Sequence, residues 1–113
     1  MLEKWYKEIE SMYDQMVEWR RYLHENPELS FQEINTSKMI GDLLESFGVE
    51  VRRNVGGNGV VGKIYGAKPG KTVALRADFD ALPIQDEKDV AFKSKVPGVM
   101  HACGHDGHTA TLP

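Results

Sequence analysis

Residues 43–52 read Leu-Leu-Glu-Ser-Phe-Gly-Val-Glu-Val-Arg, and the spacing of the apolar side chains changes within this stretch. Up to Phe47 the apolar residues recur at three- and four-residue steps, which is typical of an amphipathic helix. After Gly48, Val49 and Val51 alternate with charged residues, which is typical of a strand. We therefore expect a helix that stops at Gly48, where glycine suits a left-handed C-terminal conformation, and a strand directly after it.

Two helices are predicted up to this point. The first covers residues 2–23, where eight apolar residues form one stripe: Leu2, Trp5, Tyr6, Ile9, Met12, Tyr13, Met16 and Leu23. It should end at Asn26-Pro27, because proline disfavours helical dihedral angles in the residue before it. The second helix should begin at Ser30, since Ser30 and Glu33 have the spacing of a capping box, in which each side chain bonds the other's backbone amide.

About three strands are predicted after the second helix. The first covers residues 49–55 and ends in a Gly-Gly-Asn-Gly turn. Residues 60–65 and 72–77 read as two further strands, and the Pro69-Gly70 turn signal between them predicts a hairpin. No period holds over residues 79–107, and an irregular stretch of that length is usually functional or disordered.

Composition and charge exclude several classes of function. The chain has 14 basic and 17 acidic residues without a run of Lys or Arg, which argues against a nucleic-acid partner. It shows no signal peptide and no apolar segment long enough to span a bilayer, so we expect no membrane contact and a cytoplasmic location. A length of 113 residues predicts one folding unit.

Residues 100–108 read Met-His-Ala-Cys-Gly-His-Asp-Gly-His and hold three of the four histidines and the only cysteine. In an extended backbone Cys103 and His105 would point to the same side and could bind one metal ion, with Gly104 allowing a close approach. Thiolate and imidazole are good zinc ligands, but a closed site needs about four donors. Two other interpretations stay open: Cys103 could be a buried packing residue, or a nucleophile activated by a histidine.

Asp78 and Asp80 form a second candidate group, because they directly follow the predicted strand 72–77. Ligands of open α/β sheets gather beyond the carboxyl ends of strands, and the period of two puts both carboxylates on one face. Asp80 could orient a metal-bound imidazole. The alternative is a polar strand end with Asp80 in a turn. For His24, we expect a structural role at the carbonyl groups that end the first helix.

Three blocks of the sequence together resemble the aminoacylase and carboxypeptidase family of dinuclear metallohydrolases. The resemblance is greatest to the branch that contains N-acyl-amino-acid amidohydrolases, hippurate hydrolases and indole-acetyl-amino-acid hydrolases. The blocks are residues 20–31 with Glu33 and Thr36, residues 76–83, and residues 100–110. They occur in the family's order and span nearly the whole chain, which makes the resemblance specific.

The resemblance implies roles for particular residues. Cys103 and His105 correspond to metal ligands, with the thiolate in the bridging place that an aspartate holds elsewhere in the family. Asp80 corresponds to an aspartate that supports catalysis without binding the metal, and Asp78 stands where other branches have a ligating histidine. Four residues are candidates for contacts around the ligands: Asp78, His101, Asp106 and His108.

The resemblance also implies a fold and a reaction. Residues 1–113 would be the N-terminal part of an α/β catalytic domain with a mixed, mostly parallel sheet between helix layers, without the lid and dimerisation domain. The reaction would be hydrolysis of the amide bond of N-acyl amino acids by two divalent ions, manganese or zinc. Because the base and the other ligands of relatives lie further along the chain, we expect this chain alone to be a truncated, inactive fragment. The alternative is a small non-catalytic metal-binding or interaction module that uses Cys103 and His105.

Overall fold

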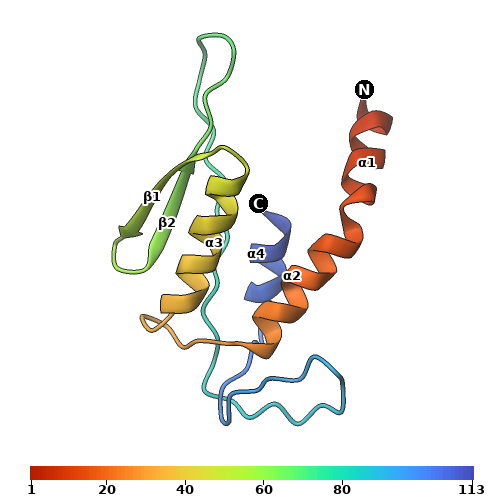
Figure 1. The fold of residues 1–113 in the computed structure, drawn as a ribbon, viewed down its shortest axis with the longest axis vertical. Coiled ribbons are helices and arrows are strands. Elements are labelled where there is room, and N and C mark those ends of the chain that lie inside the picture. The colour runs from red at the N-terminus through yellow and green to blue at the C-terminus, as the bar shows by residue number, and fades with distance from the viewer.

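The computed structural model describes all residues 1–113 and contains four helices and one two-stranded sheet (Figure 1). In chain order the elements are α1 (Leu2–Ser11), α2 (Tyr13–Glu25), α3 (Ile34–Ser46), β1 (Glu50–Val55), β2 (Gly59–Lys63) and α4 (His105–Thr111). The sheet packs on α3, and α4 packs on α2. The predicted α/β class is confirmed, although the two strands within this chain are antiparallel. None of the helices combines the length and apolarity that crossing a membrane requires.

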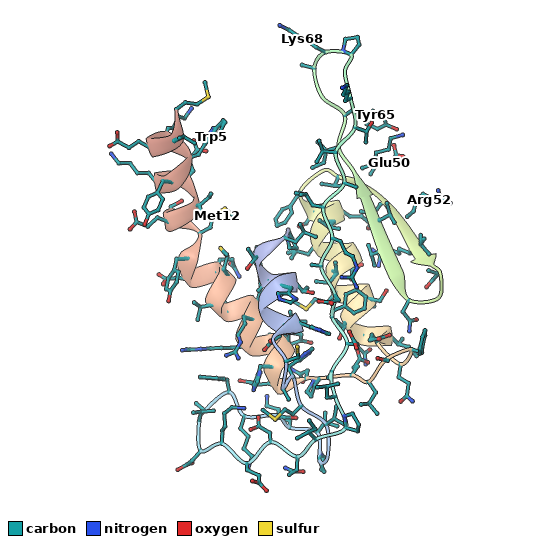
Figure 2. The ribbon with its side chains drawn as sticks, turned by 180° about the vertical axis from the view of Figure 1, so that it is seen from behind. Trp5, Met12, Glu50, Arg52, Tyr65 and Lys68 are labelled. Atoms are coloured by element: carbon teal, nitrogen blue, oxygen red, sulfur yellow. The ribbon has the colours of Figure 1, made fainter.

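The predicted first helix is in fact two helices, because the backbone at Met12 (φ −93°, ψ −2°) leaves the regular helical range. α2 ends at Glu25, directly before Asn26-Pro27, as expected. Only the last part of α2 is anchored, through the buried residues Leu23 and His24. α1 contains no buried residue and extends away from the body, so its apolar stripe faces open space. Figure 2 shows Trp5 and Met12 on this stripe.

The predicted capping box does not form, and α3 begins at Ile34 instead of Ser30. The Ser30 hydroxyl donates to the Asp80 carboxylate at 2.8 Å. The Glu33 carboxylate accepts from the backbone N–H of Phe31 at 2.9 Å, and so bonds a residue outside the helix. The sequence spacing was therefore compatible with a cap, but both side chains found other partners.

Glu28 takes the place of the predicted cap. Its carboxylate accepts from the backbone N–H groups of Asn35 and Thr36 at 3.2 and 2.6 Å, and from the Thr36 hydroxyl at 2.6 Å. These N–H groups belong to the first turn of α3 and have no partner within the helix. A negative charge also suits the positive end of the helix dipole, so Glu28 stabilises the start of α3.

The predicted strands at residues 49–55 and 60–65 are confirmed, whereas the strand at 72–77 and its hairpin with 60–65 do not form. Gly48 has φ +78° and β1 follows it, as expected. β2 corresponds to the predicted strand 60–65, but it pairs with β1 and not with residues 72–77. Residues 64–80 form no strand and no ladder; Val73 and Leu75 are 81% and 78% exposed.

Two short backbone pairings bring the irregular segment after residue 80 against the rest of the chain. The Ala81 N–H donates to the Glu28 carbonyl at 2.8 Å. Leu82 and Met100 exchange two hydrogen bonds of 2.9 and 3.0 Å in an isolated antiparallel bridge. Because Leu82 and Met100 are paired, the carboxylates just before Leu82 lie near the histidines just after Met100.

Candidate metal centre

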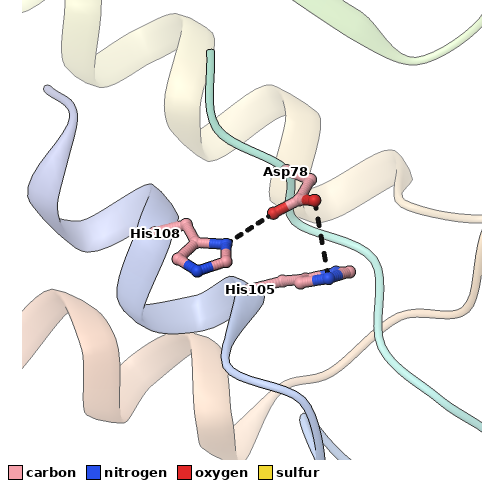
Figure 3. Close-up of side chains that lie close together, drawn as sticks. All are labelled: Asp78, His105 and His108. Carbon is pink, nitrogen blue, oxygen red and sulfur yellow. Dashed lines mark hydrogen bonds and ion pairs between the residues drawn. The ribbon is translucent and has the colours of Figure 1, made fainter.

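Asp78 and two histidines of α4 form a compact group of metal-binding side chains (Figure 3). Oδ1 of Asp78 lies 2.8 Å from Nδ1 of His108, and Oδ2 of Asp78 lies 3.4 Å from Nε2 of His105. One ligand atom from each residue lies within 4.8 Å of the other two. His105 and His108 share a helix face because they are three residues apart, and their ring centroids are 5.6 Å apart.

The backbone before α4 differs from the predicted extended form. Gly104 has φ +129°, a conformation that glycine adopts readily and other residues avoid, and α4 begins at the next residue. The prediction that Cys103 and His105 share a face assumed an extended backbone, and that assumption is wrong. His105 sits at the first position of α4, whereas Cys103 is an exposed free thiol in the preceding loop.

Asp80 determines how the His105 ring is oriented. Nδ1 of His105 lies 2.8 Å from Oδ1 of Asp80 and 3.1 Å from the Asp80 carbonyl oxygen. Both partners only accept hydrogen bonds, so we place the ring proton on Nδ1, which leaves a lone pair on Nε2 facing Asp78. The Ser30 hydroxyl bonds the other oxygen of Asp80 at 2.8 Å. A carboxylate on one imidazole nitrogen and a free lone pair on the other is the usual arrangement of a metal-binding histidine.

Both aspartates of the centre are held in their ionised form. The hydrogen bond from His108 lowers the pKa of Asp78 below its ordinary value, with a further contribution from nearby His105. Burial raises the pKa of Asp80, but the hydrogen bonds from Ser30 and His105 outweigh burial, so its pKa is also lowered. Two carboxylates therefore carry negative charge at neutral pH, which favours a cation between them and the imidazoles.

The structure thus brings together four of the residues that the sequence pointed to: Asp78, Asp80, His105 and His108. Two hydroxyl groups bond the aspartates of the centre, and the sequence pattern predicted neither contact. Ser30 bonds Asp80, and the Thr109 hydroxyl donates to the Asp78 carbonyl at 2.7 Å. The role of Cys103 as a ligand stays a prediction, since it belongs to no group of three metal-binding side chains here.

Asp106 and His101 lie in the interior, next to the centre. Asp106 is 1% exposed, and its side-chain partners are His24 and Arg20. The prediction that His24 contacts the carbonyl groups at the end of the first helix is therefore wrong, because its ring contacts Asp106 instead. His101 is 5% exposed and neither of its ring nitrogens has a hydrogen-bond partner. Burial lowers the pKa of His101, and nearby Asp106 opposes this shift.

The donor set fits a divalent transition ion. One carboxylate and two imidazoles are ligands that zinc and manganese accept, and a thiolate is a further good donor for zinc. The three donors of Asp78, His105 and His108 are close enough to converge without a change of backbone.

Residues 74–112 match the sequence model of a family described as Peptidase family M20/M25/M40. Over 106 residues the chain is 64% identical to a Bacillus subtilis protein named as an amidohydrolase, YhaA; the match covers 94% of this chain and 27% of that protein. Over 111 residues it is 50% identical to the N-acyl-L-amino acid amidohydrolase of Geobacillus stearothermophilus. This match covers 94% of this chain and 30% of that protein. The chain therefore spans less than a third of the length of these relatives.

A solved structure extends the likeness to the fold. The crystal structure of the Bacillus subtilis YxeP protein, described as a dinuclear metal-binding peptidase of the M20 family, superposes with a TM-score of 0.84 at 47% identity. The superposition covers 89% of this chain and 28% of that one. Sequence and fold therefore agree on the family that this chain resembles. The chain is thus similar to part of the proteins of the peptidase family M20/M25/M40, and the resemblance inferred from the three sequence blocks is confirmed.

Proposed function

We propose that this chain is the N-terminal part of the catalytic domain of an enzyme that hydrolyses the amide bond of N-acyl amino acids with two divalent ions, manganese or zinc. The observation that carries the proposal is the His105 imidazole, which Asp80 holds at Nδ1 while Nε2 faces Asp78. The relative named as an N-acyl-L-amino acid amidohydrolase and the solved structure described as a dinuclear metal-binding peptidase support it.

In this proposal Cys103 and His105 are metal ligands, with Asp78 and His108 beside them. Divalent ions in such a centre polarise the scissile carbonyl and lower the pKa of a bound water. Asp80 keeps the His105 ring in the tautomer that exposes Nε2. Amide hydrolysis also needs a carboxylate that takes a proton from water and gives one to the leaving amine. Because we assign that base to no residue of this chain, we propose that the chain alone is inactive.

Hydrolysis of N-acetyl and N-benzoyl amino acids by the full-length protein tests the proposal. We expect activity with manganese or zinc, loss of activity with a chelator, and recovery when the metal is returned. His105→Ala should abolish activity, whereas Lys68→Ala, an exposed residue far from the centre, should not. Full-length protein with bound metal that cleaves none of these substrates would refute the proposed function, and turnover by this chain alone would refute the proposed inactivity.

A non-catalytic metal-binding module is the second candidate function. The observation in its favour is that one ligand atom each of Asp78, His105 and His108 lies within 4.8 Å of the other two, so the three could hold one ion with water as the fourth ligand. Cys103 and His105 remain the ligands expected from the sequence for such a module. Metal titration followed by dialysis separates the two candidates, because a module retains one ion per chain whereas an incomplete dinuclear centre loses its metal.

The proposed substrate is a small molecule, and the cytoplasmic location and the absence of nucleic-acid and membrane partners stay predictions from the sequence. The metal identity follows only from the donor types, since carboxylate and imidazole suit manganese and zinc, and thiolate favours zinc.

A further inference from the structure

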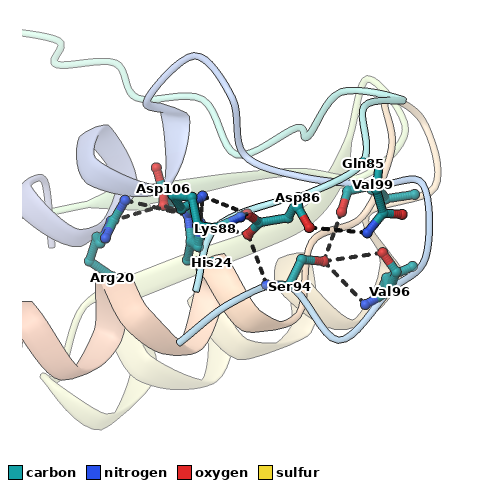
Figure 4. Close-up of polar contacts among 9 residues, drawn as sticks. All are labelled: Arg20, His24, Gln85, Asp86, Lys88, Ser94, Val96, Val99 and Asp106. Carbon is teal, nitrogen blue, oxygen red and sulfur yellow. Dashed lines mark hydrogen bonds and ion pairs between the residues drawn. The ribbon is translucent and has the colours of Figure 1, made fainter. Parts of the chain in front are cut away.

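We propose that His24 is a positioning residue for the metal centre, because its bond to Asp106 fixes the first turn of α4 and with it the imidazole of His105. The proposal rests on the metal-binding part of the proposed function and is independent of the substrate. Figure 4 shows the residues involved, which come from α2, from the loop after residue 84 and from α4.

The contact between His24 and Asp106 is short and buried. Nδ1 of His24 lies 2.8 Å from Oδ2 of Asp106, and each residue is 1% exposed. Nε of Arg20, one turn earlier on α2, lies 3.0 Å from the same oxygen. Hydrogen bonds to a buried carboxylate are strong, and a buried carboxylate that loses its partner carries a large desolvation cost. Asp106 is therefore held firmly against α2.

The other side of the His24 ring is held by the loop. Nε2 of His24 lies 3.1 Å from Nζ of Lys88 and 3.3 Å from Oδ2 of Asp86. Asp86 is fully buried and also accepts from the backbone N–H groups of Lys88 and Ser94. Both carboxylates can only accept, and Asp106 is the nearer, so we place the ring proton on Nδ1; Nε2 then accepts from Lys88 and touches Asp86 without a hydrogen bond. The ring cannot turn without breaking contacts on both sides.

Asp106 directly follows His105 in the chain. The contacts that hold Asp106 in place therefore also restrict the position of His105 in the metal centre. The N-terminal residue before α4, Gly104, has no side chain to cap the helix, and no side-chain cap is formed there. The first turn of α4 is thus fixed from α2 through Asp106. His105, at its first position, must meet Asp80 at 2.8 Å on one side and Asp78 at 3.4 Å on the other. A small rotation of this turn would separate His105 from one of these partners.

Two substitutions at the same position separate positioning from general stability. The amide nitrogen of Asn occupies nearly the place of the histidine Nδ1, and the amide nitrogen of Gln nearly the place of Nε2. His24→Asn can keep the bond to Asp106, whereas His24→Gln cannot reach Asp106 and can only donate to Asp86 or, with its amide turned, accept from Lys88. Both variants lose about the same amount of ring packing, so their melting temperatures should fall to a similar degree.

The readout is the dissociation constant for zinc and for cobalt in the full-length protein, measured with the melting temperature of the metal-free form. We expect His24→Gln to bind metal about tenfold more weakly, the lower end of the range for lost partners of metal-binding histidines, and His24→Asn to stay within about threefold of wild type. Equal weakening in both variants, or none in either, would overturn the proposal.

A second pair of variants covers the case in which His24→Gln does not fold. Asp106→Ala removes the acceptor beside His105 and should weaken metal binding by about tenfold, whereas Asp86→Ala removes the carboxylate on the far side and should weaken it less than threefold. Equal effects would reject the positioning role. If this pattern appears in a protein that binds metal but hydrolyses no acyl amino acid, the positioning role stands and the proposed function falls.

Discussion

The Asp80 carboxylate and Nδ1 of His105 lie 2.8 Å apart although 25 residues separate them in the chain. Ser30, 50 residues before Asp80, bonds its other oxygen. One carboxylate therefore joins the loop before α3, the irregular segment and the start of α4. The same contact leaves Nε2 of His105 free to bind a metal ion, so the fold and the chemistry of the centre depend on one side chain.

Removal of the Asp80 carboxylate should weaken metal binding. We expect Asp80→Ala to raise the zinc dissociation constant about 10- to 100-fold, because His105 then loses the partner that sets its tautomer and ring orientation. Ser30→Ala is the matched control and should have a smaller effect, since the carboxylate stays in place. Isothermal titration calorimetry measures both, and an unchanged constant in Asp80→Ala would contradict the assigned role.

Cobalt spectroscopy tests whether Cys103 is a ligand. If the thiolate binds the metal, the cobalt-loaded full-length protein should show a sulfur-to-metal charge-transfer band in the near ultraviolet, because cobalt occupies zinc sites with similar ligands. Cys103→Ser should lose this band and keep the weaker visible bands of the remaining ligands. A wild-type spectrum without the band would show that Asp78, His105 and His108 bind the ion without sulfur.

Asp86 should make stability depend on pH in the acid range. The hydrogen bonds from the Lys88 side chain and the Ser94 backbone hold the pKa of Asp86 well below its ordinary value of 3.8. A lowered pKa in the folded state contributes stability above the unfolded value and loses it as the pH falls towards the folded value. The difference in unfolding free energy between wild type and Asp86→Asn should thus shrink from about pH 6 to about pH 2, as measured by urea titration. A constant difference would count against this.

Gly59 should be indispensable for the hairpin. A Cβ at this position would collide with the backbone carbonyl oxygen of Val55, its partner in the ladder, and backbone cannot move aside as a flexible side chain does. We expect Gly59→Ala to destabilise the chain by about 1–3 kcal/mol. Gly70→Ala is the control, because a Cβ there meets no atom within 4 Å. Thermal unfolding of the two variants checks the prediction, and equal melting temperatures would show it to be wrong.

Local signals predicted the parts of the fold that depend on neighbours in sequence. The end of α2 before Asn26-Pro27 and the left-handed Gly48 before β1 follow from restrictions on single residues. The capping box failed because Ser30 bonds Asp80, and a residue 50 positions away is invisible to a four-residue pattern. The strand at residues 72–77 failed because alternation shows that a segment could pair but not that a partner lies beside it.

The sequence identified the two segments that meet at the candidate site, whereas the ligand roles predicted for their residues stay predictions. The cluster at residues 100–108 and the carboxylates before Pro83 do meet, as their residue types suggested. Their arrangement was wrong at Gly104, where one positive φ turns an expected extended segment into the start of α4. The buried pairing of His24 with Asp106 could not be read from either residue, since each is also common at exposed helix ends.

Only four of the fourteen buried residues of this chain are large or small aliphatic side chains, Leu23, Ile40, Ala81 and Ala110, whereas eight are polar or charged. The heat capacity of unfolding rises with apolar surface exposed and falls with polar surface exposed. An interior of this kind therefore gives a small heat capacity of unfolding and a flat stability curve with temperature. Its integrity depends on keeping water out of a hydrogen-bonded interior more than on hydrophobic burial.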